Sequence, residues 1–475
     1  SYPFIYLYDR ALTWFWNSRY ENLEVLNFEE IRKIAPSTSL IFSPCHRSHI
    51  DYLALSYLLY YKDLMLPQIV AGKNLNLPLV GPLLRKGGAF FMRRSFSNNR
   101  LYSVVFYEHL KKLMQRGHSI EFFPEGGRSR SGKLMPPRPG IISMILRSFL
   151  GMDEKQVSFV PISINYEKVL EGNSYINEVM GAEKKKENLK DIFSVFRDFR
   201  NYLGEAYLQF GEPINLNALL KEYPLSDYSS EKDWLFKVTP VLGKKIMTTI
   251  NDSTVVTSTA LFSLAILNSD GFSISNRELV SRIELLKSLL AEDKYSAKTL
   301  ICEKTGEEII DQMRKLGFLS KEDINDRISL TNLEAAKLSF YRNNISHLLI
   351  FESLICGFFQ YQKEIVKEDL LQSIKMIYPF LKEEFFLKWD EADLDQLINL
   401  KLNKLINKNL ILEDSNNYKR PDFKSREFYE TQSLGKLVQP SIDRFYVLIS
   451  QLWKNSAEHI SKNELERNSL EILKN

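Results

Sequence analysis

Short apolar runs alternate with longer segments of helical period from about residue 37 to about residue 215. The runs with the length of buried strands are SLIFSP, LPQIVAG, AFFMRR, HSIEFFPEGG, VSFVPISINY and EAYLQFGEPI. The segments with a helical spacing of apolar positions are DYLALSYLLYY, LPLVGPLLRKG, NNRLYSVVFYEHLKKLMQRG and GIISMILRSFLG. This alternation predicts an α/β domain with a central sheet.

The pattern changes near residue 216, where helical segments continue and few strands are predicted. Helical period is found in LFKVTPVLGKKIMTTI, NRELVSRIELLKSLLAED, GEEIIDQMRKLG, ISHLLIFESLICGFFQYQKEI and LDQLINLKLNKLINKNLI. We therefore expect a largely α-helical domain over residues 216–475. Residues 1–36 are rich in aromatic side chains, and we expect a helical segment that packs on the α/β domain or lies at an apolar–water boundary.

Composition narrows the class of protein only a little. The chain has 475 residues, more than one hydrophobic core supports, and its 44% apolar and 26% charged residues are ordinary for a globular protein. Its cysteines, Cys45, Cys302 and Cys356, form no CxxC pair, so we expect no structural zinc site, no disulfide framework and a reducing compartment. We expect no signal peptide and no membrane-spanning helix, and the initial Ser suggests a fragment or a processed form.

The stretch HRSHID, residues 46–51, carries the first candidate chemistry. On a continuous helix His46 and Asp51 would lie about 140° apart, so they touch only if His46 lies in a loop and Asp51 in the first helical turn. A carboxylate on one imidazole nitrogen fixes the tautomer, which makes His46 a candidate general base. One alternative is a metal site that includes His49, although no further ligand cluster supports a metal. The other is a polar helix start that Ser48 caps, with two surface histidines.

Two further stretches supply cations. RKGGAFFMRRS places Arg93 and Arg94 at the end of a predicted strand, where guanidinium groups suit an anionic oxygen cluster. IEFFPEGGRSRSGK ends a predicted strand in a glycine turn that carries Arg128, Arg130 and Lys133. Ordinary surface charge is the alternative interpretation of both stretches.

The glycine turn is not a nucleotide-binding P-loop, although residues 127–133 have its spacing. Leu134 replaces the metal-binding Ser/Thr, and Pro136-Pro137 block the helix that must follow. The cations and backbone N–H groups of the turn still suit a phosphate group. Glu125 opens the turn, where we expect it to orient the cations or to bind a substrate hydroxyl.

The distribution of charge supports an anion site in the α/β domain. From Arg85 to Arg147 there are 13 Lys/Arg and 3 Glu, although the net charge of the whole chain is only +4. An anionic small molecule held near His46 and Asp51 accounts for this excess. A nucleic-acid groove is the competing use, but no recognised nucleic-acid module accompanies the cations, and we expect no nucleic acid as a partner.

Four blocks in a fixed order resemble those of the glycerolipid acyltransferases. They are HRSHIDYL, GGAFFMRR, FFPEGGRSRSGK and VPISINYEKVLEG, within residues 43–172. The chain is most similar to bacterial glycerol-3-phosphate acyltransferases of the PlsB type, and AGKNLNLP and GAEKKKENL extend the resemblance to about residue 215. The resemblance implies an N-terminal segment (1–36), an acyltransferase domain with a central mixed sheet flanked by helices (37–215) and a helical C-terminal domain (216–475).

The resemblance also implies a role for each candidate residue. His46 would deprotonate the sn-1 hydroxyl of glycerol 3-phosphate, and Asp51 would orient His46. Glu125 and Gly126 would belong to the acceptor-binding block, and Pro161 would line the acyl-donor side. The cations that would hold the phosphate are Arg93, Arg94, Arg128, Arg130 and Lys133.

The reaction that the resemblance implies is direct attack on the thioester of acyl-CoA or acyl-carrier protein, without a metal or a cofactor. The product would be 1-acylglycerol 3-phosphate, in the first step of phospholipid synthesis. The expected location is peripheral, on the cytoplasmic face of a membrane, which is the inner membrane if the source is bacterial.

Departures from the family pattern and rival functions remain open. Pro124 stands where an apolar β residue is expected, and the large N-terminal region of longer members is absent. A dihydroxyacetone-phosphate acyltransferase would share the mechanism, whereas the long helical half argues against a lysophosphatidic acid acyltransferase. Two other classes are a non-catalytic membrane-surface scaffold and a metal-dependent phosphoesterase.

Overall fold

The computed structural model divides into two compact units of the chain. Unit 1 comprises Ser1–Ser263 and Ala291–Ile345, and unit 2 comprises Leu264–Leu290 and Ser346–Asn475. The chain therefore enters unit 2, returns to unit 1 and ends in unit 2, a path that periodicity alone does not reveal. The structure describes residues 2–73, 76, 78, 80–93, 99–152, 156–171, 202–319, 326–454 and 460–474.

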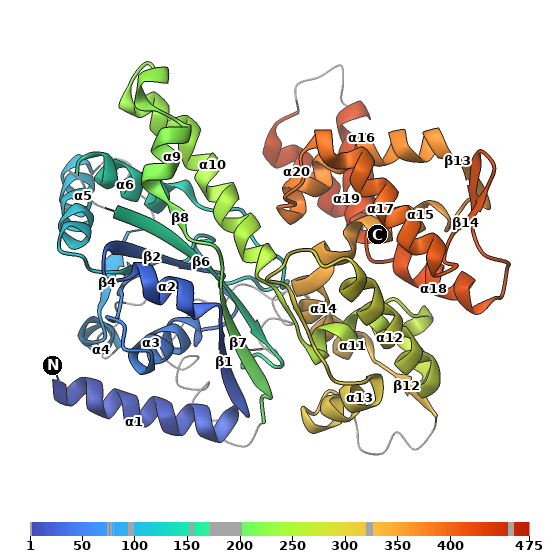
Figure 1. The fold of residues 1–475 in the computed structure, drawn as a ribbon, viewed down its shortest axis with the longest axis horizontal. Helices are drawn as coiled ribbons and strands as arrows, with labels where there is room; N and C mark the ends of the chain where they lie inside the picture. The colour runs from blue at the N-terminus through green and yellow to red at the C-terminus, as the bar shows by residue number, and fades with distance from the viewer. Residues whose placement is uncertain are drawn as a thin grey trace. The chain divides into compact units, whose positions relative to one another are not determined.

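Unit 1 is built on a mixed sheet of eight strands (Figure 1). The strands are β1 (Asn22–Leu26), β2 (Thr38–Pro44), β3 (Gln68–Gly72), β4 (Ala89–Met92), β5 (Ile120–Glu121), β6 (Gln156–Tyr166), β7 (Glu205–Phe210) and β8 (Ile214–Asn215). Their order is β1-β7-β6-β2-β5-β3-β4, with β8 beside β6. Strands β6, β2, β5, β3 and β4 run parallel to one another, whereas β7 and β8 are antiparallel to β6. The structure confirms the predicted α/β class with a central mixed sheet.

Helices cover both faces of this sheet. They are α1 (Tyr2–Arg19), α2 (Phe28–Ile34), α3 (Asp51–Tyr61), α4 (Val80–Lys86), α5 (Arg100–Gln115), α6 (Pro139–Leu150), α9 (Leu216–Glu222) and α10 (Glu231–Asp252). The connections from β2 to β3 and β4 advance along the sheet, and those from β4 to β5 and β6 return. Right-handed crossovers therefore place α3 and α4 on one face and α5 and α6 on the other (Figure 1). Helix α10 packs on α6, and α1 packs on α3.

Strand β5 is much shorter than the run HSIEFFPEGG predicts. Only Ile120 and Glu121 pair with the neighbouring strands β2 and β3. Pro124 has no N–H group to donate to a ladder, and Gly126 has a φ of 68°, a left-handed conformation that ends extended structure. The chain therefore leaves the sheet early and forms a long loop at the carboxyl end of β5, before α6.

The predicted N-terminal helix is present as α1. Phe15 and Trp16 are buried, and the Trp16 ring lies 6.2 Å from the ring of Tyr57 on α3. Trp14 on the same helix is 57% exposed. None of the helices in the described part of the chain is long and apolar enough to cross a membrane.

Further elements of unit 1 follow the sheet. They are β9 (Val255–Val256), β11 (Leu300–Ile301), α13 (Gly306–Lys315), β12 (Arg327–Ser329) and α14 (Asn332–Ile345). Helix α11 (Ser258–Leu267) begins in unit 1 and ends in unit 2, and α12 (Asn276–Glu292) begins in unit 2 and ends in unit 1.

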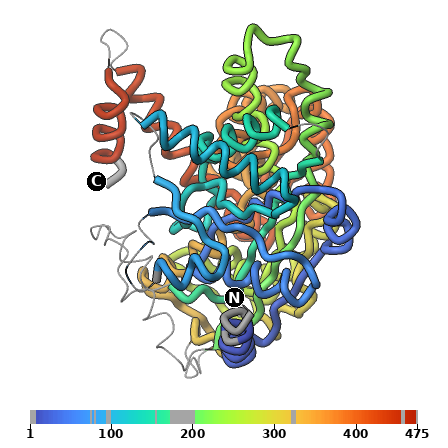
Figure 2. Tube along the Cα trace, turned by 90° about the vertical axis from the view of Figure 1, so that its left-hand side faces the viewer, coloured from blue at the N-terminus to red at the C-terminus, as the bar shows by residue number. Residues whose placement is uncertain are grey.

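Unit 2 is mainly helical, as the periodicity predicts. Its further elements are α15 (Ile350–Phe358), α16 (Lys367–Phe385), α17 (Leu394–Asn407), α18 (Arg426–Gly435), α19 (Gln439–Lys454), α20 (Lys462–Lys474) and the strands β13 (Glu364–Val366), β14 (Leu412–Asp414) and β15 (Asn417–Lys419). Helices α19 and α20 lie side by side (Figure 2). The three short strands form an antiparallel sheet, which helical period does not predict.

A buried group of charges lies in the core of unit 2. Glu352 on α15 is fully buried, and its carboxylate pairs with Lys401 and Lys404 on α17. The Lys401 Nζ–Glu352 Oε1 distance is 3.2 Å, and Lys404 also donates to the carbonyl of Leu289 at 3.0 Å. Burial by itself raises the pKa of Glu352, but the two lysine charges outweigh burial and hold the pKa below its usual range. Glu352 is therefore the counter-ion that lets two lysines stay inside the unit.

We expect Glu352→Gln to lower the free energy of unfolding by about 3–5 kcal/mol, because it leaves two buried lysines without their anion. Chemical denaturation at neutral pH measures this change. The matched control is Glu413→Gln, since Glu413 pairs with Lys367 but is half exposed, and the expected loss is below about 1 kcal/mol. Equal losses for the two variants would contradict a structural role for the buried charges.

Candidate active site

The candidate site lies at the carboxyl ends of β2, β5 and β6. Strands β2 and β5 are neighbours, but β2 leads to α3 on one face of the sheet and β5 leads to α6 on the other. Open α/β sheets bind ligands beyond the carboxyl ends of strands whose connections diverge in this way. The stretch HRSHID follows β2 and the glycine turn follows β5, so the topology brings both predicted stretches to this edge.

His46 and Asp51 are in contact, as the hypothesis of a loop followed by a helix requires. The distance from His46 Nδ1 to Asp51 Oδ2 is 2.8 Å. His46 lies in the loop after β2, and Asp51 is the first residue of α3. The side chain of His46 is 15% exposed and that of Asp51 is fully buried. Because the carboxylate accepts the proton on Nδ1, the Nε2 atom of a neutral ring is left to accept another proton.

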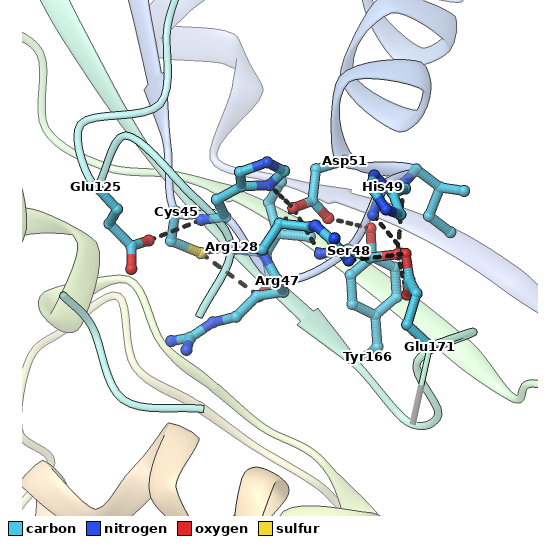
Figure 3. Close-up of polar contacts among 12 residues, drawn as sticks. Cys45, Arg47, Ser48, His49, Asp51, Glu125, Arg128, Tyr166 and Glu171 are labelled. Atoms are coloured by element: carbon cyan, nitrogen blue, oxygen red, sulfur yellow. Dashed lines mark hydrogen bonds and ion pairs between the residues drawn. The ribbon is translucent and has the colours of Figure 1, made fainter. Parts of the chain in front are cut away.

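Asp51 accepts three more hydrogen bonds. The backbone N–H groups of Arg47 and Ser48 donate to Oδ2 at 2.6 and 2.9 Å. The hydroxyl of Tyr166 donates to Oδ1 at 2.7 Å (Figure 3). Burial and the charge of Asp51 raise the pKa of Tyr166 well above its usual range, so the hydroxyl keeps its proton and remains a donor. These donors offset the cost of a fully buried carboxylate.

Ser48 does not cap α3, contrary to the sequence prediction. The residue that precedes the helix is Ile50, and the hydroxyl of Ser48 instead donates to Glu171 Oε2 at 2.8 Å. The backbone N–H of His49 donates to the same carboxylate at 2.6 Å (Figure 3). The Ser48 oxygen also accepts from Ile50 N at 3.4 Å, but Ser48 lies two residues before the residue that precedes the helix, so this bond does not cap α3.

The backbone and ring of His46 are held by the loop after β5. Its N–H donates to Glu125 Oε1 at 2.8 Å, and its carbonyl accepts from Ser129 N at 2.9 Å. The imidazole stacks on Phe123, with ring centroids 3.9 Å apart and 22° between the planes. The ring is therefore fixed by Asp51 at one edge and by Phe123 on one face.

Glu125 serves two backbone groups. Besides His46 N, it accepts from Met135 N at 2.9 Å, so it closes the loop after β5 against the loop after β2. Burial raises the pKa of Glu125, while the charge of Arg47 and the two hydrogen bonds oppose that rise. Gly126 follows in its left-handed conformation, which a larger residue adopts only with strain. The roles predicted for Glu125 and Gly126 in acceptor binding stay predictions.

The same loop carries three of the predicted cations. Arg128 is buried, and its Nη1 atom lies 3.9 Å from Oε1 of Glu171. Arg130 and Lys133 are half-buried. Their position beyond the carboxyl end of β5 is compatible with an anion near His46, and their contact with phosphate stays a prediction.

The remaining predicted residues lie on other strands. Arg93 follows β4 at the same edge of the sheet, beyond β5 and β3 from β2, and its guanidinium lies over the Tyr102 ring at 4.9 Å. Arg94 lies outside the described residues. Pro161 is buried within β6, where it is paired in register with Ser43 of β2. The structure therefore brings His46, Asp51 and the loop after β5 together and leaves the parts of Arg93 and Pro161 as predictions.

Three residues that hold the site are not predicted by the sequence pattern. Arg47 is buried and donates through Nη1 to the carbonyl of Gly132 in the glycine turn. Tyr166 ends β6 and Glu171 follows it, and both reach the loop after β2. Their partners are 115 and 123 residues away along the chain, so only the fold brings them together. Their one signal in the sequence is their position inside the blocks HRSHIDYL and VPISINYEKVLEG.

Glu121 is a further buried acid at the site. It is fully buried in β5, and within the described part of the chain neither of its carboxyl oxygens has a hydrogen-bond partner. Burial raises the pKa of Glu121 well above its usual range, and the charge of Asp51 adds to that rise. Burial therefore favours the protonated form of Glu121 over the ionised form.

Cys45, directly before His46, is poorly placed as a nucleophile. It is fully buried, and its Sγ atom accepts from the N–H of Ile164 at 3.2 Å. Burial raises the pKa of its thiol to about 11, so little thiolate forms at neutral pH. Among the residues that the structure describes, no three His, Cys, Asp or Glu side chains come together as a set of metal ligands.

Known proteins match the chain over almost its whole length. Residues 24–165 match the family Acyltransferase, and residues 175–475 match the family Glycerol-3-phosphate acyltransferase C-terminal region. The glycerol-3-phosphate acyltransferase of Pseudomonas paraeruginosa is 36% identical over 475 residues, which cover 98% of this chain and 57% of that protein. The protein of the same name from Pseudomonas putida strain GB-1 is 37% identical over 474 residues, with the same two coverages. The chain thus spans 57% of the length of these relatives.

One solved structure is similar at a lower level. The crystal structure of the 1-acyl-sn-glycerophosphate (LPA) acyltransferase PlsC from Thermotoga maritima has 18% sequence identity and a TM-score of 0.29. The match covers 50% of this chain and 75% of that chain.

We expect Glu121→Gln to become more stable than the wild type as the pH rises. Unfolding lets Glu121 release its proton above its ordinary pKa, whereas the folded protein retains it, so wild-type stability falls with pH in this window. From about pH 5 up to the raised pKa of the folded protein, the difference in unfolding free energy should widen by up to about 1.4 kcal/mol per pH unit. Melting curves over this range measure the difference, with Glu108→Gln on the exposed surface of α5 as the control. A gap that stays constant with pH would mean that Glu121 is ionised in the folded protein.

Proposed function

The chain belongs to the glycerol-3-phosphate acyltransferase family, and we propose that it transfers a fatty acyl group from acyl-CoA or acyl-carrier protein to the sn-1 hydroxyl of glycerol 3-phosphate. The product is 1-acylglycerol 3-phosphate. The observation that carries the proposal is the 2.8 Å contact of His46 Nδ1 with the buried carboxylate of Asp51. This contact leaves the other ring nitrogen to act as a base beside a loop rich in cations.

In the proposed reaction His46 moves one proton twice. Nε2 takes the proton of the sn-1 hydroxyl while the hydroxyl oxygen attacks the thioester carbonyl carbon. The tetrahedral intermediate then collapses, the carbon–sulfur bond breaks, and the departing thiolate takes the proton from Nε2. Asp51 keeps the ring in one tautomer and stabilises the imidazolium that forms between these steps. Base catalysis of this kind contributes about 10²–10⁴ in rate.

We propose direct transfer without an acyl-enzyme. The nearest cysteine, Cys45, is buried with a pKa of about 11, which disfavours it as a nucleophile. The hydroxyl of Ser48 donates to Glu171 rather than to His46, so the histidine does not activate it. Both facts support attack by the substrate hydroxyl itself.

We propose that the phosphate of the acceptor binds the cations beyond the carboxyl ends of β4 and β5. Arg128, Arg130 and Lys133 are in the loop that also holds His46, so a phosphate bound there brings a hydroxyl of the same molecule close to the base. Arg93 and Arg94 are the further candidates. Their guanidinium groups suit two phosphate oxygens at once. Glu125 and Gly126 shape this loop, and Pro161 is the candidate on the acyl-donor side.

We further propose that the enzyme works at a membrane surface, peripherally and on the cytoplasmic face. The support is exposed apolar side chains on α1, at the end of α3 and just after it, where Trp14 is 57%, Tyr61 52% and Met65 55% exposed. Thr13, which precedes Trp14, joins α1 to the end of α3 through a 3.1 Å hydrogen bond with the Tyr61 hydroxyl. Trp and Tyr favour the boundary between lipid and water.

We expect His46→Ala to lower kcat by about 10²–10⁴ and Asp51→Asn to lower it by about 10² or more, because each removes part of the base. The measurement is transfer from palmitoyl-CoA to radiolabelled glycerol 3-phosphate with EDTA present. His109→Ala, on the exposed surface of α5, is the control and should retain wild-type activity. Equal activity of His46→Ala and the wild type would exclude the proposed base.

The same assay separates the rival functions. Dihydroxyacetone phosphate added as a competitor should compete more weakly than unlabelled glycerol 3-phosphate if the acceptor is as proposed. Stronger competition would favour the dihydroxyacetone-phosphate branch. If the wild-type protein forms no product with either acyl-CoA or acyl-carrier protein as the donor, the result would support a non-catalytic scaffold. If it releases inorganic phosphate and EDTA abolishes the release, the result would support a metal-dependent phosphoesterase.

We expect Trp14→Ser to weaken binding to vesicles that contain anionic phospholipid by about tenfold, because an interfacial aromatic side chain is lost. Co-sedimentation of protein with vesicles measures the bound fraction. The matched control is Trp453→Ser in unit 2, where Trp453 is 82% exposed. An equal loss in both variants would contradict a membrane-facing surface on α1 and α3.

A further inference from the structure

Helix α14 contacts the two loops that hold the site. It belongs to residues 291–345, the segment that returns to unit 1 after the chain has entered unit 2. One contact is with the glycine turn after β5, and the other is with the segment that follows β6. The family comparison places α14 in the C-terminal region, whose sequence suggests no chemistry.

The first contact packs the glycine turn against the helix backbone. Gly132 has a φ of 83°, and a Cβ atom at this position would clash with the carbonyl oxygen of Phe340 on α14. The side-chain amide of Asn343 donates to the carbonyl of Ser131 at 2.8 Å. The carbonyl of Gly132 accepts from Arg47, so the turn is held between α14 and the loop after β2.

The second contact is buried. The hydroxyl of Tyr341 accepts from the backbone N–H of Val169 at 3.0 Å, and both residues are almost fully buried. The ring of Tyr341 is fixed edge-on against Phe318, with 5.5 Å between the centroids. Two residues after Val169, Glu171 binds Ser48 and lies near Arg128. Tyr341 therefore acts through Glu171 on the cation loop, which is the loop after β5 that carries Arg128, Arg130 and Lys133.

We propose that α14 is a positioning element of the acceptor site, in which Tyr341 and Asn343 hold the segment around Glu171 and the glycine turn in the arrangement that binds phosphate. This inference rests on the proposed function, because it takes the cation loop as the phosphate-binding group. The two side chains act through the loops and are positioning residues. The C-terminal region thereby contributes to affinity for the acceptor.

The helix adds support to loops that contain no regular secondary structure. Residues 122–138 form no strand or helix, and their cations lie on an irregular backbone. A loop that must be ordered when the ligand binds loses affinity, whereas a loop that is already held in place does not. The effect of loosening α14 should therefore fall on acceptor binding and spare the acyl donor.

The test compares Tyr341→Phe and Asn343→Ala with two controls that each lose a hydrogen bond elsewhere. Ser339→Ala removes a hydroxyl whose bond to the Ala336 carbonyl stays within α14. Tyr378→Phe removes a tyrosine hydroxyl that binds the Trp389 carbonyl in unit 2. We expect each test variant to raise the KM for glycerol 3-phosphate about fivefold, with the KM for palmitoyl-CoA unchanged and both controls like the wild type.

Calorimetric titration with glycerol 3-phosphate on the same five proteins gives a readout that does not need turnover. A dissociation constant raised about fivefold in the two test variants alone would support the inference. Test variants that match the controls, or a KM for the acyl donor that rises equally, would overturn it. A wild type that binds glycerol 3-phosphate without transferring acyl groups would refute the proposed function. In that case the dissociation constants of the test variants and the controls would still decide whether α14 positions the acceptor site. A wild type that does not bind glycerol 3-phosphate would refute both.

Discussion

The buried carboxylate of Asp51 is the constraint on which the site depends. A carboxylate that is fully removed from water is tolerated only when hydrogen bonds replace its hydration. Asp51 obtains them from the ring of His46, from the N–H groups of Arg47 and Ser48, and from the hydroxyl of Tyr166. These donors come from the loop after β2 and from the end of β6. The geometry of the base is thus a consequence of satisfying one buried charge, which also fixes where α3 begins.

Other buried acids of unit 1 are also stabilised by hydrogen bonds to their carboxylates. Glu125 binds the backbone of His46 and Met135, and Glu171 binds Ser48 and the backbone of His49. Glu167, directly after β6, accepts from the N–H groups at the start of α11. Burial raises the pKa of each of these three acids, and hydrogen bonds to their carboxylates oppose that rise. Carboxylates therefore fix the loops in place, and the predicted cations remain the candidates for phosphate.

Local features of the sequence predicted much of this arrangement. The spacing of His46 and Asp51 requires a loop followed by a helix, and α3 begins at Asp51. The apolar runs predicted the central sheet, because a short run such as VSFVPISINY, with β-branched and aromatic residues, suits a buried strand, whereas the mixed direction of the strands was implied only by the family resemblance. The predictions were wrong for the Ser48 cap and for the length of β5. Ser48 is a good helix cap by its type, but α3 begins only at Asp51, and the hydroxyl of Ser48 donates to Glu171, which is 123 residues away. Strand β5 is short because of Pro124 and the left-handed Gly126, which apolar content does not reveal.

The central claim is that Asp51 fixes one tautomer of His46. Its most direct test is the ¹⁵N spectrum of protein labelled in the histidine rings, at about pH 8, where an ordinary imidazole is neutral. The resonances of His46 are those that disappear in His46→Ala. We expect a proton on Nδ1 and none on Nε2 in the wild type, and a mixture of tautomers in Asp51→Asn. A wild-type ring that carries its proton on Nε2 would contradict the account, because that nitrogen could not accept a proton from a substrate.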